Sequence, residues 1–177
     1  MGLAAPAVGA CLILSGFGLV DAFWVGRMGP KAVAAMSAAS YFLWSMQSIV
    51  SLVDVGTHAH VARRAGEGDW GRVGAAAVEG LALCVPVSLV SMVAFMALAD
   101  RAFAFMGASG EVASMAREYF DIIVLGLPVT LAYMVVSAIF RGTGDTRTPF
   151  VLLASSFVLN AFLDPILIGG WGPVPGM

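Results

Sequence analysis

Asn160-Ala-Phe-Leu-Asp164-Pro165 closes an apolar run that begins at Pro149. Asn160 and Asp164 are four residues apart, so on a helix their side chains lie on the same face, one above the other. Pro165 follows directly and offers the helix no backbone N–H at that point. A carboxylate and an amide on one face of an apolar helix, beside a loosened backbone, predict a site for a cation or a proton.

The composition around this stretch is that of a membrane protein. Of the 177 residues, 60% are hydrophobic and only 11% are charged, and the mean hydropathy is +0.93. Soluble domains have about 25% charged residues, which argues against a water-soluble fold. The net charge of −2 is too small to indicate a nucleic-acid partner. The partner that this composition predicts is the lipid bilayer.

The apolar runs predict an all-α integral membrane protein with about five transmembrane helices, because a helix needs about 20 mostly apolar residues to cross a bilayer. Gly126-Leu127-Pro128 lies in the middle of the fourth helix, where Pro128 predicts a bend. Pro6, near the start of the first helix, predicts either a harmless start or an early kink. We expect a single membrane domain over residues 1–177, with helices over about 3–25, 32–62, 73–99, 118–140 and 149–168.

Charges in the loops predict the orientation of the chain. The loops after the second and fourth helices carry five Arg residues, and the loops after the first and third carry four Lys and Arg residues. Positive charges gather on the cytoplasmic side of membrane proteins, so we expect the N-terminus to be cytoplasmic. The first and fifth helices then cross the membrane in the same direction.

Asp21 is a second carboxylate, and it lies near the end of the first helix, which crosses the membrane in the same direction as the helix of Asp164. It lies 18 residues after Leu3, and Asp164 lies 15 residues after Pro149. At 1.5 Å per residue the two carboxylates lie within about 5 Å of each other along the membrane normal. If the two helices are neighbours, Asp21, Asn160 and Asp164 form one site that shares a proton or holds a monovalent cation. In the alternative interpretation both carboxylates simply sit at the outer interface, in contact with water.

Four segments of the chain carry a resemblance to a known family. In order, they are Leu19-Val-Asp-Ala-Phe-Trp-Val-Gly-Arg-Met-Gly29, Gly66-Glu-Gly-Asp69, Arg141-Gly-Thr-Gly-Asp-Thr-Arg-Thr-Pro149 and Leu159-Asn-Ala-Phe-Leu-Asp-Pro165. These segments resemble the MATE (multidrug and toxic compound extrusion) family of transporters. The resemblance covers the whole chain and implies the first five helices of the N-terminal six-helix lobe, in a fold of two such lobes around a central cleft. It also implies antiport of H⁺ or Na⁺ against small organic, cationic or amphipathic compounds at the cell membrane, with a cytoplasmic N-terminus.

The resemblance also implies roles for individual residues. Asp21, Asn160 and Asp164 match the cation site proposed for the DinF-like branch of the family, and Asp164 favours that branch because the other main branch generally lacks it. Pro6 matches a first-helix proline that is proposed to bend as the site takes up a proton. The resemblance implies no metal and no cofactor apart from the coupling H⁺ or Na⁺. We expect the chain to be truncated, because the sixth helix and the C-terminal lobe of the family, its partner in such a transporter, do not follow in these 177 residues.

Other functions were weighed on particular residues. Gly142-Thr-Gly-Asp145 has the spacing of the Gly-x-Gly-Asp motif of intramembrane aspartyl proteases, but Arg141 and Arg147 flank it in a polar turn, so we expect no enzyme. His58 and His60 are two residues apart, which on a helix points them to different faces, and they predict no metal site.

Two alternatives to a drug exporter stay open. One is a transporter of related architecture that flips lipid-linked oligosaccharides, although the apolar cores of the first, second, fourth and fifth helices contain no Lys or Arg to bind an anionic headgroup. The other is an inactive, truncated membrane fragment.

Overall fold

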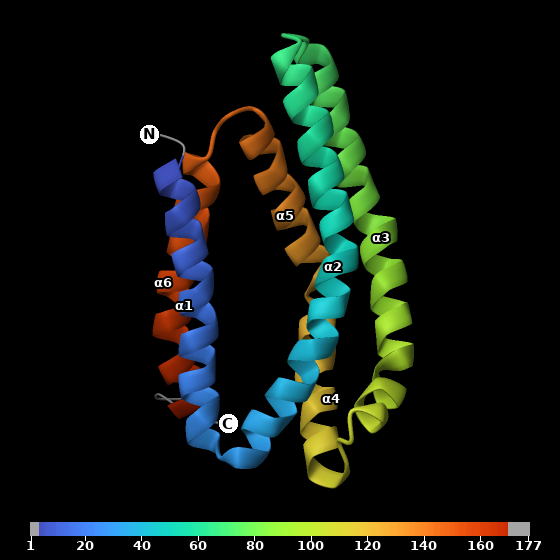
Figure 1. The fold of residues 1–177 in the computed structure, drawn as a ribbon, viewed down its shortest axis with the longest axis vertical. Coiled ribbons are helices and arrows are strands. Elements are labelled where there is room, and N and C mark those ends of the chain that lie inside the picture. The colour runs from blue at the N-terminus through green and yellow to red at the C-terminus, as the bar shows by residue number, and fades with distance from the viewer. Residues whose placement is uncertain (1–3, 170–177) are drawn as a thin grey trace. The chain divides into compact units, whose positions relative to one another are not determined.

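The computed structural model describes residues 4–169, and these residues form six α-helices without a strand among them (Figure 1). The all-α prediction is therefore confirmed. The helices are α1 (Ala4–Met28), α2 (Pro30–Gly66), α3 (Trp70–Phe105), α4 (Gly110–Leu125), α5 (Leu127–Gly142) and α6 (Arg147–Gly169).

Three of these helices are long and apolar enough to cross a membrane: α1 from Val8 to Met28, α2 and α3. A fourth span is formed if α4 and α5 are taken together, as two halves bent by 49°. Within the described residues α6 does not meet the same criterion, and its side chains there include Arg147 and Asp164. At 23 residues α6 is about 34 Å long, which is sufficient for the hydrocarbon core of a bilayer.

The bend lies at Gly126, between α4 and α5. Pro128 is in the first turn of α5, where its missing N–H interrupts no helical hydrogen bond. The Gly126 N–H donates to the carbonyls of Ile122 and Ile123 over 3.3 and 3.0 Å, so the end of α4 stays bonded. The fourth expected helix is thus divided at the Gly126-Leu127-Pro128 stretch.

The helices also begin and end at residues other than those expected. α3 continues to Phe105 and α4 starts at Gly110, so much of the expected 100–117 connection is helical. The physical reason is ion pairing: Arg117 lies 2.8 Å from Asp100 and 2.9 Å from Asp121. Charges that neutralise one another this way allow helices to continue past the apolar core.

The chain divides into two compact units. One unit contains α1 and α6, which lie side by side and run in the same direction (Figure 1). Small and aromatic residues fit together there. A Cβ at Gly9 would lie 2.7 Å from the ring of Phe150, and one at Gly16 would lie 3.1 Å from the ring of Phe157. Glycine therefore allows the two helices to approach closely.

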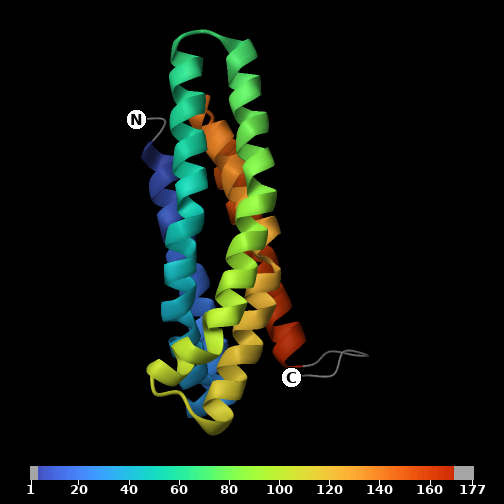
Figure 2. The same ribbon diagram turned by 90° about the vertical axis from the view of Figure 1, so that its right-hand side faces the viewer.

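The second unit contains most of α2 together with α3, α4 and α5. The ring of Phe42 on α2 lies 4.9 to 6.0 Å from the rings of Phe95, Phe103 and Phe120 on α3 and α4. Figure 2 shows α2 and α3 as a long antiparallel hairpin. Asp69 caps the start of α3 by accepting a hydrogen bond from the Arg72 N–H over 3.1 Å.

Candidate cation site

Asn160 and Asp164 of α6 are hydrogen-bonded to each other. The Nδ2 of Asn160 donates to the Oδ1 of Asp164 over 3.0 Å. This contact follows from the spacing of four residues, which places the two side chains on one face of the helix. The amide group is thereby oriented, with its N–H groups toward the carboxylate and its oxygen directed elsewhere.

Two oxygen atoms of this pair are buried and accept no hydrogen bond. They are the Oδ1 of Asn160 and the Oδ2 of Asp164. A buried acceptor that is left without a donor costs about 1–3 kcal/mol. Both atoms are hard oxygen ligands of the kind that hard cations prefer. A bound proton on the carboxylate, or a cation between the two oxygens, would remove that cost.

Asp21 of α1 lies beside this pair. The Gly9–Phe150 and Gly16–Phe157 contacts share one register along the two parallel helices. In both contacts the residue of α6 comes 141 positions after its partner on α1. The same offset places Asp21 beside Phe162, two residues or about half a helical turn before Asp164. The carboxylates of Asp21 and Asp164 are close enough for their charges to repel each other. The structure therefore places the three residues near one another on α1 and α6, and their role as an ion site stays a prediction.

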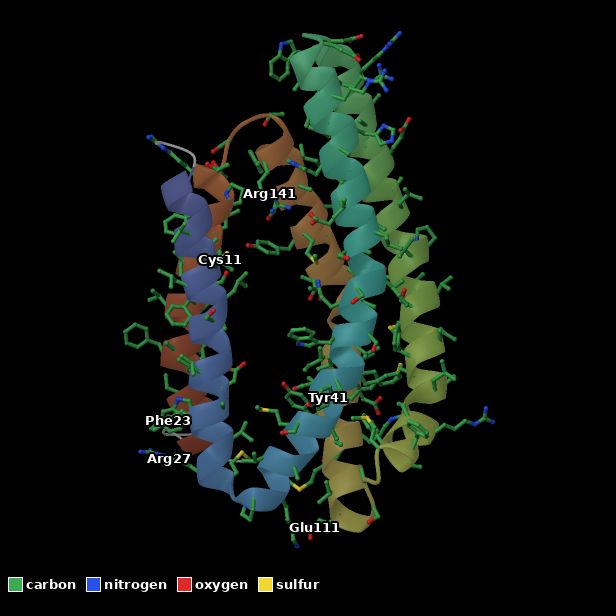
Figure 3. The ribbon with its side chains drawn as sticks, viewed as in Figure 1. Cys11, Phe23, Arg27, Tyr41, Glu111 and Arg141 are labelled. Atoms are coloured by element: carbon green, nitrogen blue, oxygen red, sulfur yellow. The ribbon has the colours of Figure 1, made fainter. Side chains whose placement is uncertain are left out.

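The arrangement is suited to binding one positive charge. Two ionised carboxylates at close range in an apolar setting repel each other, and a shared proton or a monovalent cation relieves the repulsion. Because the two groups interact, they titrate as a pair rather than separately. Nearby, the guanidinium of Arg27 lies 4.6 Å from the ring centroid of Phe23 and 5.1 Å from that of Trp24 (Figure 3).

Of the three prolines noted in the sequence, only Pro128 has a side chain within the described residues. Pro128 stands at the bend between α4 and α5, in the second unit. The side chain of Pro6 lies outside the described residues, although the backbone at that position belongs to α1. The side chain of Pro165 also lies outside them. The proposed bending role of Pro6 stays a prediction.

Sequence reasoning missed a second polar group, inside the second unit. Asp54 lies in the middle of α2, and its carboxylate is 2.8 Å from the Nη2 of Arg141 at the end of α5. One turn along each helix, the Nδ1 of His58 lies 3.3 Å from the carbonyl oxygen of Ala138. Figure 3 labels Arg141 at this end of α5. The available signal was Asp54 itself, the first charge after a long uncharged run.

The histidines and Asp145 are not grouped as metal ligands in the part of the chain that the structure describes. Within residues 4–169 no three His, Cys, Asp or Glu side chains are grouped as metal ligands. His58 instead contacts the Ala138 carbonyl, and His60 is exposed. Asp145 follows the end of α5, where its N–H donates to the carbonyl of Phe140 over 2.9 Å.

Comparison with known proteins identifies the family. A family model described as MatE matches residues 6–166. The chain belongs to the MatE family. The members of this family are transporters, not enzymes, which confirms that the Gly142-Thr-Gly-Asp145 stretch is not a protease motif.

Curated relatives of the MatE chain include transporters with different named cargoes. It is 30% identical to the probable multidrug resistance protein NorM of Thermotoga maritima, covering 99% of this chain and 38% of the relative. It is 27% identical to an FAD transporter of Shewanella oneidensis, over 99% of this chain and 39% of the relative. It is 29% identical to the multidrug resistance protein PmpM of Pseudomonas aeruginosa, over 99% and 37%. The chain spans about two fifths of the length of these relatives.

Solved structures agree with this assignment. The structure is similar to that of a MOP superfamily transporter from Pyrococcus furiosus, with a TM-score of 0.89 and 28% identity over 97% of this chain and 38% of that one. It is similar to an outward-facing multidrug resistance MATE transporter, with a TM-score of 0.89 and 28% identity over 97% and 39% of the two chains. The prediction of a MATE-type helical lobe is confirmed.

Proposed function

We propose that this chain supplies the cation site of an antiporter, which exports organic compounds in exchange for H⁺ or Na⁺. The observation that carries the proposal is the pair of buried, unsatisfied oxygens on Asn160 and Asp164, with the Asp21 carboxylate beside them. The names of the relatives NorM and PmpM support the export of drugs. Assignment of the chain to the DinF-like branch belongs to the same proposal and rests on Asp164.

The coupling step follows from the charge of the site. With both carboxylates ionised the site attracts a cation, and binding it neutralises one negative charge near the end of α1 and α6. Releasing that ion on the other side of the membrane restores the repulsion between Asp21 and Asp164. Because a proton and Na⁺ both bind oxygen ligands of this kind, the residues accommodate either ion.

Efflux from proteoliposomes tests the proposal. The longest available protein containing this chain is reconstituted, and export of a fluorescent organic cation is driven by a proton or sodium gradient. Asp21→Asn keeps the size of the side chain and removes its charge. We expect gradient-driven export to fall at least about 100-fold, toward the rate of empty liposomes. That factor corresponds to the loss of about 3 kcal/mol from the interaction between the coupling cation and the Asp21 carboxylate.

Asp100→Asn is the matched control for this experiment. Its side chain is 82% exposed, so its ion pair with Arg117 is a surface pair worth at most about 1 kcal/mol, and it lies in the other unit, near the end of α3. We expect its export rate to stay within about twofold of the unmodified protein, as for most surface substitutions. Export that survives Asp21→Asn at the control rate would remove Asp21 from the coupling site.

The same vesicles test which class of compound the protein transports. We propose a cationic or amphipathic organic compound, because Asp21 and Asp164 are acidic and neither has a basic partner among the ion pairs of the described residues. The relative named as an FAD transporter makes an anionic dinucleotide the sharpest competitor. Gradient-driven movement of FAD with no movement of the organic cation would replace the cationic cargo by an anionic one.

The proposal places the protein in the cell membrane with its N-terminus on the cytoplasmic side. The helix ends that flank the turns after α2 and α5 carry Arg63, Arg64, Arg72, Arg141 and Arg147, and the excess of positive charge supports this orientation. Cysteine labelling tests it. A Cys placed at Gly68, in the α2–α3 turn, should react in inverted membrane vesicles and stay protected in intact cells.

A further inference from the structure

A groove of about 320 Å³ runs between α2 and α3, within the second unit. Its polar end is formed by His60 and Glu79, and its apolar end by Leu52, Val53 and Leu83. The α2–α3 hairpin that carries it is plain in Figure 2. Nothing in the proposed transport step uses these residues.

Two glycines on the groove create its shape. Gly80 of α3 packs against Thr57 of α2 so closely that a Cβ there would lie 2.5 Å from the Thr57 hydroxyl oxygen. Gly56, on the same wall as Thr57, has no atom within 4 Å of the position its Cβ would take. The helices therefore touch at Gly80, and open space remains beside Gly56.

Glu79 has no positively charged partner among residues 4–169. Its side chain is exposed, and within residues 4–169 no ion pair involves Glu79 or His60. The basic residues of the nearby turn are engaged elsewhere: Arg63 and Arg64 both bind Glu67, and Arg72 binds Asp69. Hydrogen bonds from Arg64, the larger cause, and from Arg63 lower the pKa of Glu67 below its ordinary value. An acidic group in the groove is thus left to bind a cation from outside.

The depth of the groove matches the boundary between headgroups and acyl chains. α2 has 37 residues and is about 55 Å long, so it extends well beyond a hydrocarbon core of about 30 Å. α3 has 36 residues and also exceeds the core, by about 12 Å at each end, and Glu79 comes nine residues, or about 13 Å, after the start of this helix. Leu83 lies one turn deeper than Glu79. The polar end therefore faces headgroups, and the apolar end faces acyl chains.

We propose that this groove binds a phospholipid whose headgroup contains a primary ammonium. The carboxylate of Glu79 accepts hydrogen bonds from the ammonium, and the ring of His60 donates one to the phosphate. An acyl chain lies along Leu52, Val53 and Leu83, with Gly56 leaving room for it. A purely anionic headgroup is disfavoured, because Glu79 repels it.

Competitive lipid retention tests the proposal. The chain is purified in mild detergent with equal amounts of phosphatidylethanolamine, phosphatidylglycerol and phosphatidylcholine, and bound lipid is counted by native mass spectrometry. We expect phosphatidylethanolamine to be retained about fivefold over either of the others, as one partly exposed ion pair of about 1 kcal/mol gives. Equal retention of the three lipids by the unmodified chain overturns the proposal.

Two variants locate the lipid. Glu79→Gln should reduce the preference for phosphatidylethanolamine to less than about twofold, whereas Glu118→Gln, the same change at an exposed residue of α4, should leave it unchanged. Gly56→Leu should fill the groove and lower phosphatidylethanolamine occupancy without loss of helix content by circular dichroism. Full retention by a folded Gly56→Leu chain, or an equal loss in Glu118→Gln, contradicts binding in this groove.

Discussion

Asn160 has two effects on the candidate site, since it orients Asp164 and offers an oxygen of its own. Its Nδ2 fixes the Oδ1 of Asp164 at 3.0 Å, which leaves the Oδ2 of Asp164 and the Oδ1 of Asn160 as the two buried atoms without a donor. Both properties come from one amide on the correct helix face. Neither a carboxylate alone nor an amide alone provides them.

Asn160→Ala should therefore weaken ion binding more than a deletion of equal size elsewhere on α6. It removes one ligand oxygen and the bond that positions Asp164, and we expect about tenfold lower affinity for the coupling ion, or about 1.4 kcal/mol. The measurement is a titration with Na⁺ or H⁺ of the purified protein. Ser155→Ala on the same helix removes a hydroxyl that only binds the carbonyl of Leu152, and should change nothing. Equal affinity in Asn160→Ala and Ser155→Ala would exclude Asn160 as a ligand.

Asp54 and Arg141 form the second residue-scale feature, and its effect is on stability. The side chain of Asp54 is 16% exposed and that of Arg141 is 38% exposed. Removing the carboxylate leaves a half-buried cation in contact with α2. We expect Asp54→Asn to destabilise the protein by about 1–2 kcal/mol, below the 3–5 kcal/mol of a fully buried pair because Arg141 keeps contact with solvent.

Thermal unfolding followed by intrinsic fluorescence measures this effect. The double variant Asp54→Asn with Arg141→Gln should recover part of the loss, since it leaves no unpaired charge. A double variant less stable than the sum of the two single variants predicts would contradict direct pairing.

At the scale of helices, close packing depends on glycine at particular positions. Gly80 touches Thr57 on α2, whereas Gly74, two turns earlier on α3, has nothing within 4 Å of its Cβ position. Gly9 and Gly16 play the same part between α1 and α6. Which glycines of a helix lie at an interface cannot be read from the sequence, because it depends on the rotation of the neighbouring helix.

Gly80→Ala and Gly74→Ala form a matched pair that tests this packing. A Cβ at Gly80 must displace Thr57 or separate the helices, and we expect a loss of about 1–3 kcal/mol. Gly74→Ala meets no neighbour and should be neutral or stabilising by up to about 1 kcal/mol, because Ala favours helix. The comparison is made by thermal unfolding in the same detergent. Equal stability of the two variants would mean that α2 and α3 do not touch at Gly80.

Sequence reasoning predicted some elements correctly and others not, for physical reasons. Apolar runs predicted the helices, the spacing of Asn160 and Asp164 predicted their contact, and Gly126 and Pro128 predicted the bend. The helix ends near 105 and 110 were missed because Arg117 pairs with Asp100 across the turn and with Asp121 within α4. The Asp54–Arg141 pair joins residues far apart in sequence, and local patterns carry no information about such contacts.

At the scale of the whole chain, two units carry different features. The unit of α1 and α6 contains the candidate cation site, and the unit of α2 to α5 contains the Phe42 cluster, the Asp54–Arg141 pair and the lipid groove. The chain spans about two fifths of its curated relatives. In our proposal the coupling ion therefore binds within this part of the transporter, and the remainder contributes to cargo movement.

Infrared difference spectroscopy of the carboxyl groups tests the central claim most directly, because it detects binding of H⁺ and of Na⁺ at a carboxylate without requiring transport. Steps in pH or in Na⁺ concentration should change a carboxyl band of the unmodified protein. The account predicts that this change disappears in both Asp21→Asn and Asp164→Asn and persists in Asp100→Asn. A change that persists in full in Asp21→Asn and Asp164→Asn would show that the ion binds elsewhere and would contradict the account.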